Sequence, residues 1–412
     1  MNLNRTKPLV AACIVVLCNF LLMIDNARAQ DKRDIQPLFQ IEIPHELPQP
    51  EKTFNEIRDL ILNNYYSDKI SDEALYWSAI KGMLRHISPP ENPDLAKIWT
   101  PEEYENVLLT LQGEQISFGI KSSFNAAEGS LTVSEVIPGS PSDGVLQPMD
   151  RILRINSEKL KNRSVADINS LLKGEEGEEI TLTINRDIEV FDVTIIRKKF
   201  NTPNLIITGL TEEVLLVDLR SFSADISKDL KKELAKYSEK RFKSIIIDLR
   251  NNSGGVFAEA LRVIELFLPE KSILLRTMQR DTGLQNYVSS NKNPFEFDIA
   301  ILMNEKTASS AEILAAALQE HRKALLIGSG TYGKGVFDRI YTLENNFRVR
   351  FITGAMYSPR GKTWQGKGLI PDFLVNQNED TLKALMKLTP EERFRKDVGI
   401  ITAYKLLDRD LD

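Results

Sequence analysis

The stretch KSIIIDLRNNSGG, from Lys243 to Gly255, decides the expected fold of the larger part of this chain. Its short continuous apolar run is typical of a strand that is buried on both faces of a sheet. Two glycines end the stretch, and the next segment, VFAEALRVIELFL, has the apolar spacing of an amphipathic helix. A buried strand, a tight turn and a helix together predict one βα unit.

Similar units lie on both sides of this stretch. Further short apolar runs are EVLLVDLR (213–220), FDIAILM (297–303) and KALLIG (323–328). Helical segments separate them, namely ISKDLKKELAKYSEK (226–240) and SSAEILAAALQEH (309–321). Buried strands that alternate with amphipathic helices predict an α/β core with a largely parallel sheet. In such sheets, the functional crevice lies outside the carboxyl ends of the strands.

Three polar loops follow these predicted strands at their carboxyl ends. They are NNSGG (251–255), NEKTASS (304–310) and SGTYGKG (329–335). Because parallel strands end at the same edge of a sheet, we expect Gly254 and Gly255, Ser309 and Ser310, and Lys334 to lie together.

The serine pair has two readings. Ser309 and Glu312 match the S-x-x-E capping box, which would make Ser309 an ordinary helix cap. A serine nucleophile can occupy the same place, because free amides at a helix N-terminus can bind an oxyanion. These residues alone leave both readings open.

A histidine base for this serine is excluded by the placing of the three histidines. His321 lies twelve positions past Ser309, or about 18 Å along a continuous helix. His45 and His86 belong to the N-terminal segments. A neutral lysine can replace histidine as general base, and Lys334 is the best-placed lysine. A Ser-Lys dyad is therefore the economical interpretation.

A phosphate-binding loop is the main rival for the lysine. GSGTYGK (328–334) satisfies G-x4-G-K, but Gly335 stands where that motif needs Ser or Thr. The next segment, VFDRIYTL, has a strand pattern instead of the required helix. Nucleotide binding is therefore disfavoured.

The N-terminus has the pattern of a secretory signal. Two basic residues precede a mostly apolar run of 17 residues (8–24), and ARA (27–29) supplies a cleavage site. An uncleaved membrane anchor is the alternative. Both cysteines, Cys13 and Cys18, lie in this segment, so the mature chain has no disulfide framework. Cleavage removes three basic residues and one acidic residue and moves the net charge from −5 to −7, which disfavours nucleic-acid binding.

Two smaller modules precede the predicted core. The region from about 50 to 112 has helical spacing, and TPEEYENVLLTL opens with a capping box at Thr100. The next hundred residues combine strand runs, turns and the short helical segment SVADINSLLKG (164–174). This β-rich module is either a structural insert or a peptide-binding module that accepts an extended chain as one more strand.

Six motifs in the same order give the chain a family resemblance. They are SAIKGMLRHISP, EVIPGSPSDGVLQPMDRILRIN, IIIDLRNNSGG, MNEKTASSAEILAAALQE, IGSGTYGKG and YSPRGKTWQGKGLIPD. On these motifs, the chain resembles the carboxy-terminal processing peptidases, the tail-specific serine proteases. The resemblance covers nearly the whole chain after the signal and implies a PDZ domain between a helical leader and a protease core.

The resemblance also implies roles for individual residues. Ser309 matches the nucleophile, Lys334 the base, and Gly255 with the amide of Ser310 the oxyanion hole. The segment SFGI, with Phe118, Gly119 and Ile120, matches the loop of a PDZ domain that binds a peptide carboxylate. No metal ion or organic cofactor is implied.

Several positions depart from the family pattern. Ser253 stands where the family has proline before the double glycine, and Met149 where it has glycine. Ser310-Ala311 inverts the family's A-S order. Asp338 stands where the family has glutamine, at a possible third catalytic position. A carboxylate near Lys334 favours the ammonium form and opposes its use as a base.

We therefore expect a multidomain α+β protein. The expected parts are a signal peptide (1–29), a leader and helical module (30–112), a PDZ domain (113–200), a serine protease core (201–376) and a C-terminal helical tail (377–412). The expected function is an exported endopeptidase, in the bacterial periplasm or cell envelope, that recognises proteins or peptides with free, apolar C-termini. A catalytically weak or inactive relative that binds peptides through its PDZ domain is the alternative, and a structural scaffold is a third reading.

Overall fold

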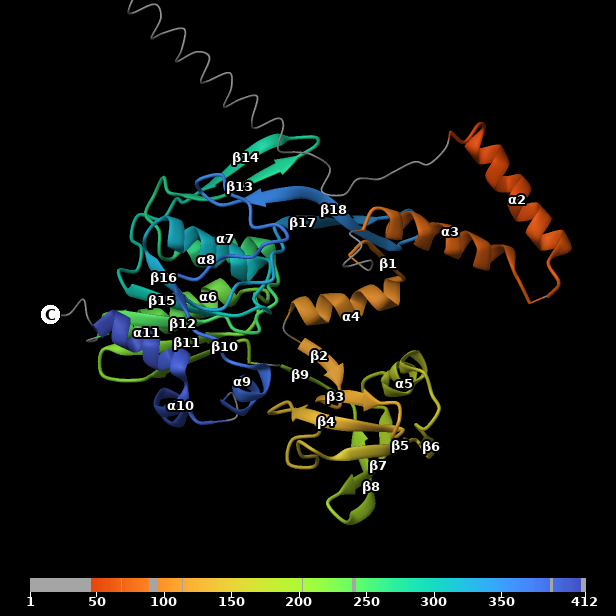
Figure 1. Ribbon diagram of the computed structural model, residues 1–412, viewed down its shortest axis with the longest axis horizontal. Helices are drawn as coiled ribbons and strands as arrows, with labels where there is room; N and C mark the ends of the chain where they lie inside the picture. Colours follow the sequence, from red (N-terminus) through yellow and green to blue (C-terminus); the bar gives the residue numbers. More distant parts are fainter. Residues whose placement is uncertain are drawn as a thin grey trace, which may run out of the picture. The chain divides into compact units, whose positions relative to one another are not determined.

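A computed structural model describes residues 46–408 except 68, 89–94, 113, 202, 239–241 and 386–387 (Figure 1). The predicted signal peptide lies outside the described residues. Two compact units are present: one contains the described residues up to Ile98 with Val349–Ile352, and the other contains Trp99–Arg348 with the described residues from Thr353 onward. Within the described part of the chain, no helix has both the length and the apolar composition needed to cross a membrane.

The first unit contains the helices expected in the N-terminal module. They are α2 (Pro50–Asn64) and α3 (Asp72–His86). Ser71 caps α3 by accepting a hydrogen bond from the Ala74 N–H at 3.1 Å. Helix α4 (Pro101–Leu111) groups with the second unit, and its capping box is present, because Thr100 and Glu103 exchange side-chain to backbone hydrogen bonds of 3.0 and 3.1 Å.

The β-rich module is built around a sheet in the order β3-β4-β5-β7-β8, with β6 paired to β5. Its elements are β3 (Ile120–Asn125), β4 (Ser130–Val136), β5 (Arg151–Ile155), β6 (Glu158–Lys159), α5 (Val165–Leu172), β7 (Glu179–Arg186) and β8 (Glu189–Ile196). β7 and β8 pair with each other in antiparallel register. Strands β2 (Glu114–Ser117) and β9 (Lys198–Asn201) pair with each other and so join the two ends of the module.

The α/β core contains a sheet in the order β10-β11-β12-β15-β16-β19. Its strands are β10 (Leu205–Gly209), β11 (Val214–Leu219), β12 (Ser244–Asp248), β15 (Asp298–Met303), β16 (Ala324–Gly328) and β19 (Phe373–Leu374). The strands from β11 to β19 run parallel, and only β10 is antiparallel to its neighbour. The prediction of a largely parallel sheet is therefore confirmed.

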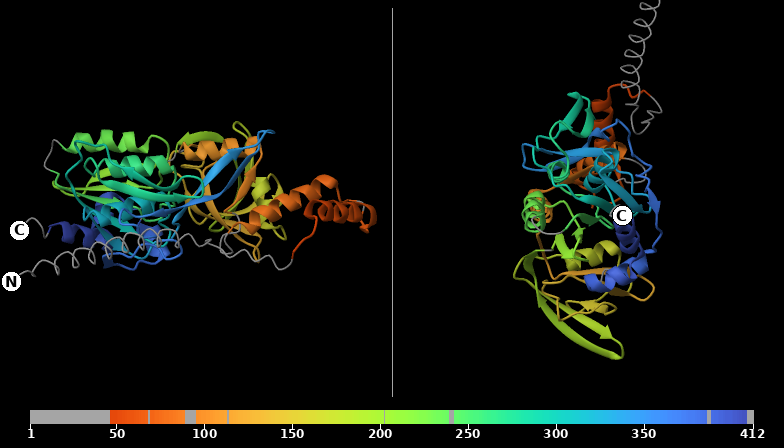
Figure 2. Two further views of the ribbon diagram at one scale, coloured as in Figure 1. Left: turned by 90° about the horizontal axis from the view of Figure 1, so that it is seen from above. Right: turned by 90° about the vertical axis from the view of Figure 1, so that its left-hand side faces the viewer.

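Helices cover both faces of this sheet (Figure 1). The first face packs against α6 (Ile226–Ser238), α7 (Phe257–Glu265) and α8 (Ser310–Glu320). The second face packs against α11 (Val398–Asp408) through Ile400, Ala403 and Leu407. Figure 2 (left) shows the sheet between these two helical layers. Burial on both faces explains why the strands are continuous apolar runs with no polar alternation.

A second sheet in the core region was not expected from the sequence. It has the order β1-β18-β13-β14, and β17 also pairs with β18. Its strands are β1 (Lys97–Trp99), β13 (Ile273–Gln279), β14 (Gly283–Val288), β17 (Val336–Thr342) and β18 (Arg348–Tyr357). Many residues of these strands are only half-buried, so the segments lack the apolar runs that reveal the main sheet.

The C-terminal helices are tied to the sheet by a buried ionic network. They are α9 (Glu379–Leu385), α10 (Pro390–Lys396) and α11. Arg250, at the end of β12, pairs with Asp248 at 2.6 Å and with Asp397 at 2.7 Å. Arg393 of α10 pairs with the same Asp248 at 2.7 Å. Burial opposes the charge of Asp248, yet the two arginines hold its pKa below the usual value. The tail is therefore an integral part of the core.

This network generates a prediction about stability. Arg250→Ala leaves buried carboxylates without their main partner, so we expect the free energy of unfolding to fall by about 3–5 kcal/mol. A urea denaturation curve measures the change. Lys228→Ala removes the exposed pair with Asp225 and serves as the control, with a midpoint close to wild type. Equal midpoints for Arg250→Ala and wild type would show that the network does not hold the tail.

Candidate active site

Three loops meet at the carboxyl edge of the parallel sheet, as the sequence predicts. The loop after β15 is joined to the loop after β12, because the Ala308 N–H donates to the Asn252 carbonyl at 2.9 Å. The Thr307 hydroxyl also donates to the Leu249 carbonyl at 2.8 Å. The loop after β16 joins the same cluster through the Tyr332 N–H and the Thr307 carbonyl, at 3.0 Å.

Ser309 stands directly before α8 in a strained conformation. Its φ is 55° and its ψ is −118°, whereas an ordinary N-cap has extended backbone angles. A non-glycine residue in such a region destabilises the folded state by on the order of 1–3 kcal/mol. Strain of this kind is concentrated at active sites. The Ser309 N–H donates to the Glu312 carboxylate at 2.9 Å, as in the predicted capping box. Ser309 is thus at the helix N-terminus, but its backbone is not that of a simple cap.

Gly254 and Gly255 lie against the serine loop, where no side chain fits. Their φ angles are 101° and 142°, which residues with a side chain rarely adopt. A Cβ on Gly254 would approach the Ser309 Cβ to 2.9 Å, and a Cβ on Gly255 would approach the Phe222 carbonyl oxygen to 2.4 Å. The double glycine therefore lets two backbones touch beside the serine.

The amides of Gly255 and Ser310 lie in the two segments that meet beside Ser309. Within the described residues, neither N–H donates a hydrogen bond inside the protein. The Ser310 hydroxyl donates to the Gly255 carbonyl at 3.1 Å and so holds the two segments together. Two free N–H groups beside a serine hydroxyl are the arrangement that can stabilise an oxyanion.

Lys334 is fixed through its backbone and paired through its side chain. Its N–H donates to the Glu312 carboxylate at 2.9 Å, and its carbonyl accepts from the Trp364 indole at 3.1 Å. Its ammonium group donates to the Asp338 carboxylate at 3.2 Å, and both side chains are mostly buried. In the part of the chain described, no hydrogen bond joins the Lys334 amine to the Ser309 hydroxyl.

The contact between Lys334 and Asp338 depends on where the strand begins. Four residues of an extended strand span about 13 Å, which would separate the two side chains. Strand β17 begins only at Val336, so Lys334 belongs to the preceding loop. The Lys334 amine and the Asp338 carboxylate meet at 3.2 Å. The strand assignment of β17 also confirms that a phosphate-binding loop, which needs a helix here, is absent.

The predicted carboxylate-binding loop, Phe118 to Ile120, is tightly packed. Phe118 is buried in the core of the β-rich module, and Ile120 packs against the same core. Gly119 has a φ of 83°, and its N–H donates to the Ser117 hydroxyl at 3.1 Å. A carboxylate that binds the Gly119 amide must therefore displace the Ser117 hydroxyl.

The histidines take no part in this cluster in the described chain. The His321 ring contacts the Ile273 carbonyl at 2.7 Å, beyond the far end of α8. His86 is the last residue of α3, and His45 lies outside the described residues. The serine cluster therefore has lysine as its basic side chain.

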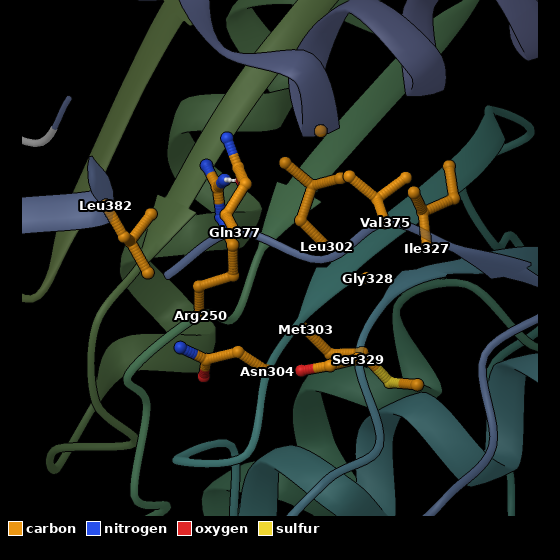
Figure 3. A pocket seen from close by; sticks show the side chains of 11 residues that line it. Arg250, Leu302, Met303, Asn304, Ile327, Gly328, Ser329, Val375, Gln377 and Leu382 are labelled. Atoms are coloured by element: carbon orange, nitrogen blue, oxygen red, sulfur yellow. Dashed lines mark hydrogen bonds between the residues drawn. The ribbon is translucent and has the colours of Figure 1, made fainter. Parts of the chain in front are cut away.

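A separate cavity of about 10 Å³ lies at the same sheet edge (Figure 3). Arg250, Asn304, Ser329 and Gln377 contribute its polar lining. The Arg250 guanidinium donates to the Gln377 side chain at 2.8 Å. The cavity has room for about one water molecule, so it is no peptide site.

Some of the residues that build the site were not recognised from the sequence. Asn252 fixes the double glycine, because its side chain accepts from the Gly254 N–H at 2.8 Å and donates to the Leu219 carbonyl at 2.7 Å. Thr331 and Glu312 hold the lysine loop. The S-x-x-E pattern pointed to Glu312 only as a cap, and nothing local marks Asn252 or Thr331.

Comparison with known proteins agrees with this architecture. Residues 213–375 match Peptidase family S41, and residues 107–185 match the PDZ domain. The fold is thus that of a multidomain α+β protein with a PDZ domain and an S41 protease core. The match to Peptidase family S41 covers the predicted protease core, and the family resemblance found in the sequence is confirmed.

Curated relatives are described as probable serine proteases. The chain is 29% identical over 319 residues to a probable CtpA-like serine protease of Staphylococcus aureus, which covers 77% of this chain and 63% of the relative. A protein of the same description from Staphylococcus saprophyticus is 26% identical over 329 residues, covering 79% and 65%. The chain thus spans less than two thirds of the length of these relatives.

Solved structures share the fold. A photosystem II D1 C-terminal processing protease gives a TM-score of 0.51 at 19% identity, covering 83% of this chain and 94% of that protein. A putative S41 protease from Bacteroides fragilis gives 0.56 at 17% identity, covering 90% and 100%.

The geometry of the serine loop generates a prediction about reactivity. We predict that an alkyl fluorophosphonate probe labels the wild-type protein on Ser309, because the strained serine lies beside two free amides. Ser309→Ala removes the labelled oxygen and should abolish labelling. Ser310→Ala loses one hydrogen bond, worth about 1 kcal/mol, so this variant should keep most of the labelling. Peptide mass spectrometry locates the adduct, and an adduct on Ser310 would contradict the assignment.

Proposed function

We propose that this protein is an exported serine endopeptidase that recognises protein C-termini through its PDZ domain and cleaves with a Ser309–Lys334 dyad. The observation that carries the proposal is the cluster at the sheet edge: a strained serine, two free amides and a lysine whose backbone is held by the same carboxylate as the serine. The match to Peptidase family S41 supports the reaction class.

Each residue has a role in acyl transfer. Lys334, in its neutral form, takes the proton of the Ser309 hydroxyl as the oxygen attacks the scissile carbonyl carbon. The N–H groups of Gly255 and Ser310 stabilise the charge that develops on the carbonyl oxygen. The carbon–nitrogen bond then breaks, and the leaving amine takes the proton back from the lysine. Water hydrolyses the ester left on Ser309, with Lys334 again acting as base.

Asp338 holds the amine of this dyad. Its carboxylate lies 3.2 Å from the Lys334 amine, which forms no hydrogen bond to the Ser309 hydroxyl within the described residues. We infer that the enzyme is slow, because the amine must leave this pair before it can take the serine proton. The same ion pair favours the second candidate function, a weak or inactive relative that binds peptides through its PDZ domain.

Substrate selection is assigned to the PDZ domain. The loop from Phe118 to Ile120 would bind a free carboxylate through backbone N–H groups, and the apolar residues around it would favour an apolar last residue. The substrates are therefore proteins or peptides with free, apolar C-termini. Residues 1–29 have the composition of a secretory signal, and the curated relatives are bacterial, which supports a site of action in the periplasm or cell envelope.

Carboxylate recognition predicts a difference between two versions of one peptide. We expect a peptide with a free apolar C-terminus to be cleaved with a KM at least tenfold lower than its C-terminal amide, because amidation removes the charge that the loop amides bind. Cleavage products are quantified by mass spectrometry. N-terminal acetylation changes the charge at the other end and should leave KM unchanged. Equal KM values for acid and amide would exclude recognition of the C-terminus.

The Lys334–Asp338 pair predicts a change in rate. Asp338→Gln weakens the contact that holds the Lys334 amine at 3.2 Å, so the amine is freer to reach the Ser309 hydroxyl. An ion pair of this kind is worth roughly 1 kcal/mol, which predicts about a fivefold higher kcat for a peptide substrate. Asp281→Asn removes a carboxylate that pairs with Arg339 at 3.9 Å, outside the site, and is the control. Equal kcat values for wild type and Asp338→Gln would reject the role of Asp338.

A further inference from the structure

The Glu312 carboxylate joins the two loops that carry the proposed dyad. One of its oxygens accepts from the Thr331 hydroxyl at 2.5 Å and from the Gly333 N–H at 2.7 Å. The other oxygen accepts from the N–H groups of Ser309 and Lys334, both at 2.9 Å. One buried side chain thus holds the backbones of both proposed catalytic residues.

A helix cap does not require this arrangement. In a capping box, the glutamate carboxylate accepts a hydrogen bond only from the N–H of the N-cap residue. Here that residue is Ser309, three positions before Glu312. The other three donors come from the loop after β16, between 19 and 22 residues away in sequence. Glu312 is fully buried, and among the described residues its carboxylate forms no ion pair. Most of the hydrogen bonds to Glu312 therefore join the two loops, and only one of them caps the helix.

The buried charge is also costly to the folded state. Burial raises the pKa of Glu312, and the hydrogen bonds from Thr331, Gly333, Ser309 and Lys334 oppose that rise only in part. A glutamate whose pKa is higher in the folded state loses stability as the pH rises through that pKa.

The opposite side of the lysine loop is fixed independently. The Lys334 carbonyl accepts from the Trp364 indole at 3.1 Å, and the Gly335 N–H donates to the Gln365 side chain at 2.8 Å. The Thr331 hydroxyl accepts from the Leu369 N–H at 2.7 Å while it donates to Glu312. The loop is thus fastened to the segment 364–369 on one side and to Glu312 on the other.

We propose that Glu312 is a positioning residue for catalysis: its carboxylate sets the distance between the Ser309 and Lys334 backbones so that the hydroxyl and the amine can exchange a proton. The inference rests on the proposed function, since it assumes that these two residues form the dyad. Thr331 takes part by orienting the carboxylate.

Glutamine tests the role because it keeps the shape and loses half of the acceptors. A carboxamide offers one oxygen and one NH2 group, so it cannot accept from donors on both sides. Its NH2 group would face either the pair Thr331 and Gly333 or the pair Ser309 and Lys334. A displacement of about 1 Å between reacting groups costs about 10²-fold in rate. For Glu312→Gln, we expect kcat to fall about 100-fold and KM to stay within about twofold, since the PDZ loop is untouched.

Two further variants complete the test of Glu312, one as a second probe of the same contacts and one as a control. Thr331→Val removes one donor, so we expect a smaller fall in kcat, of about tenfold, and this variant decides the question if Glu312→Gln does not fold. Glu259→Gln is the matched control: Glu259 is a buried glutamate in the first turn of α7 that accepts from the Ser227 N–H at 3.0 Å and pairs with Arg262. It should keep kcat within about twofold.

The experiment uses the full chain and an internally quenched peptide with a free leucine at its C-terminus. We measure kcat and KM, and record thermal unfolding to verify that each variant is folded. We also combine Glu312→Gln with Lys334→Ala. If Glu312 acts through the dyad, the double variant should be no slower than Lys334→Ala alone.

The outcomes separate the inference from the proposed function. A folded Glu312→Gln variant with wild-type kcat overturns the inference, provided that Ser309→Ala is inactive. An equal loss of kcat in Glu259→Gln overturns it as well, because the effect is then general to buried glutamates. Full activity in Ser309→Ala overturns the proposed function itself.

Discussion

The arrangement of the polar cluster at the carboxyl edge of the main sheet depends on one buried carboxylate. Glu312 receives four hydrogen bonds from two loops that are joined to different strands. The serine loop and the lysine loop are otherwise linked by the bond from the Tyr332 amide to the Thr307 carbonyl and by the bond from the Ser329 hydroxyl to the Glu305 carboxylate. The strain at Ser309 adds to this dependence, because an unusual backbone conformation persists only where its surroundings over-determine it.

Close backbone approach is the second constraint on the same edge. Gly254 lies against the serine loop, and a Cβ on Gly368 would come within 2.1 Å of the Thr331 carbonyl oxygen. These contacts bring the backbones of the loops close together, and the N–H groups of Ser309, Gly333 and Lys334 donate to Glu312. On the other side of the sheet edge, Arg250 and Arg393 neutralise buried aspartates and hold the C-terminal helices. One sheet edge thus carries a polar cluster for chemistry and an ionic cluster for stability.

The pairing of Lys334 with Asp338 bears on the proposed function. The Lys334 amine donates to the Asp338 carboxylate at 3.2 Å and, within the described residues, forms no hydrogen bond to Ser309. The serine is strained, and the backbone of the lysine loop is held by Glu312. The contact between Lys334 and Asp338 is therefore the feature on which the two proposed functions differ.

The sequence by itself determined the main sheet, its helices and the meeting of three loops at one edge. Apolar runs such as the one before Asp248 report burial on both faces, and the order of strands and helices then dictates where their carboxyl ends lie. Tertiary structure decided the rest. The partners of Glu312 lie up to 22 residues away, and the contact between Lys334 and Asp338 joins a loop residue to a strand residue. The spacing of apolar residues shows which side of a helix or strand is buried. It does not show which N–H or O–H group reaches a buried carboxylate. That depends on loop conformations, which are set by backbone contacts between segments far apart in the sequence.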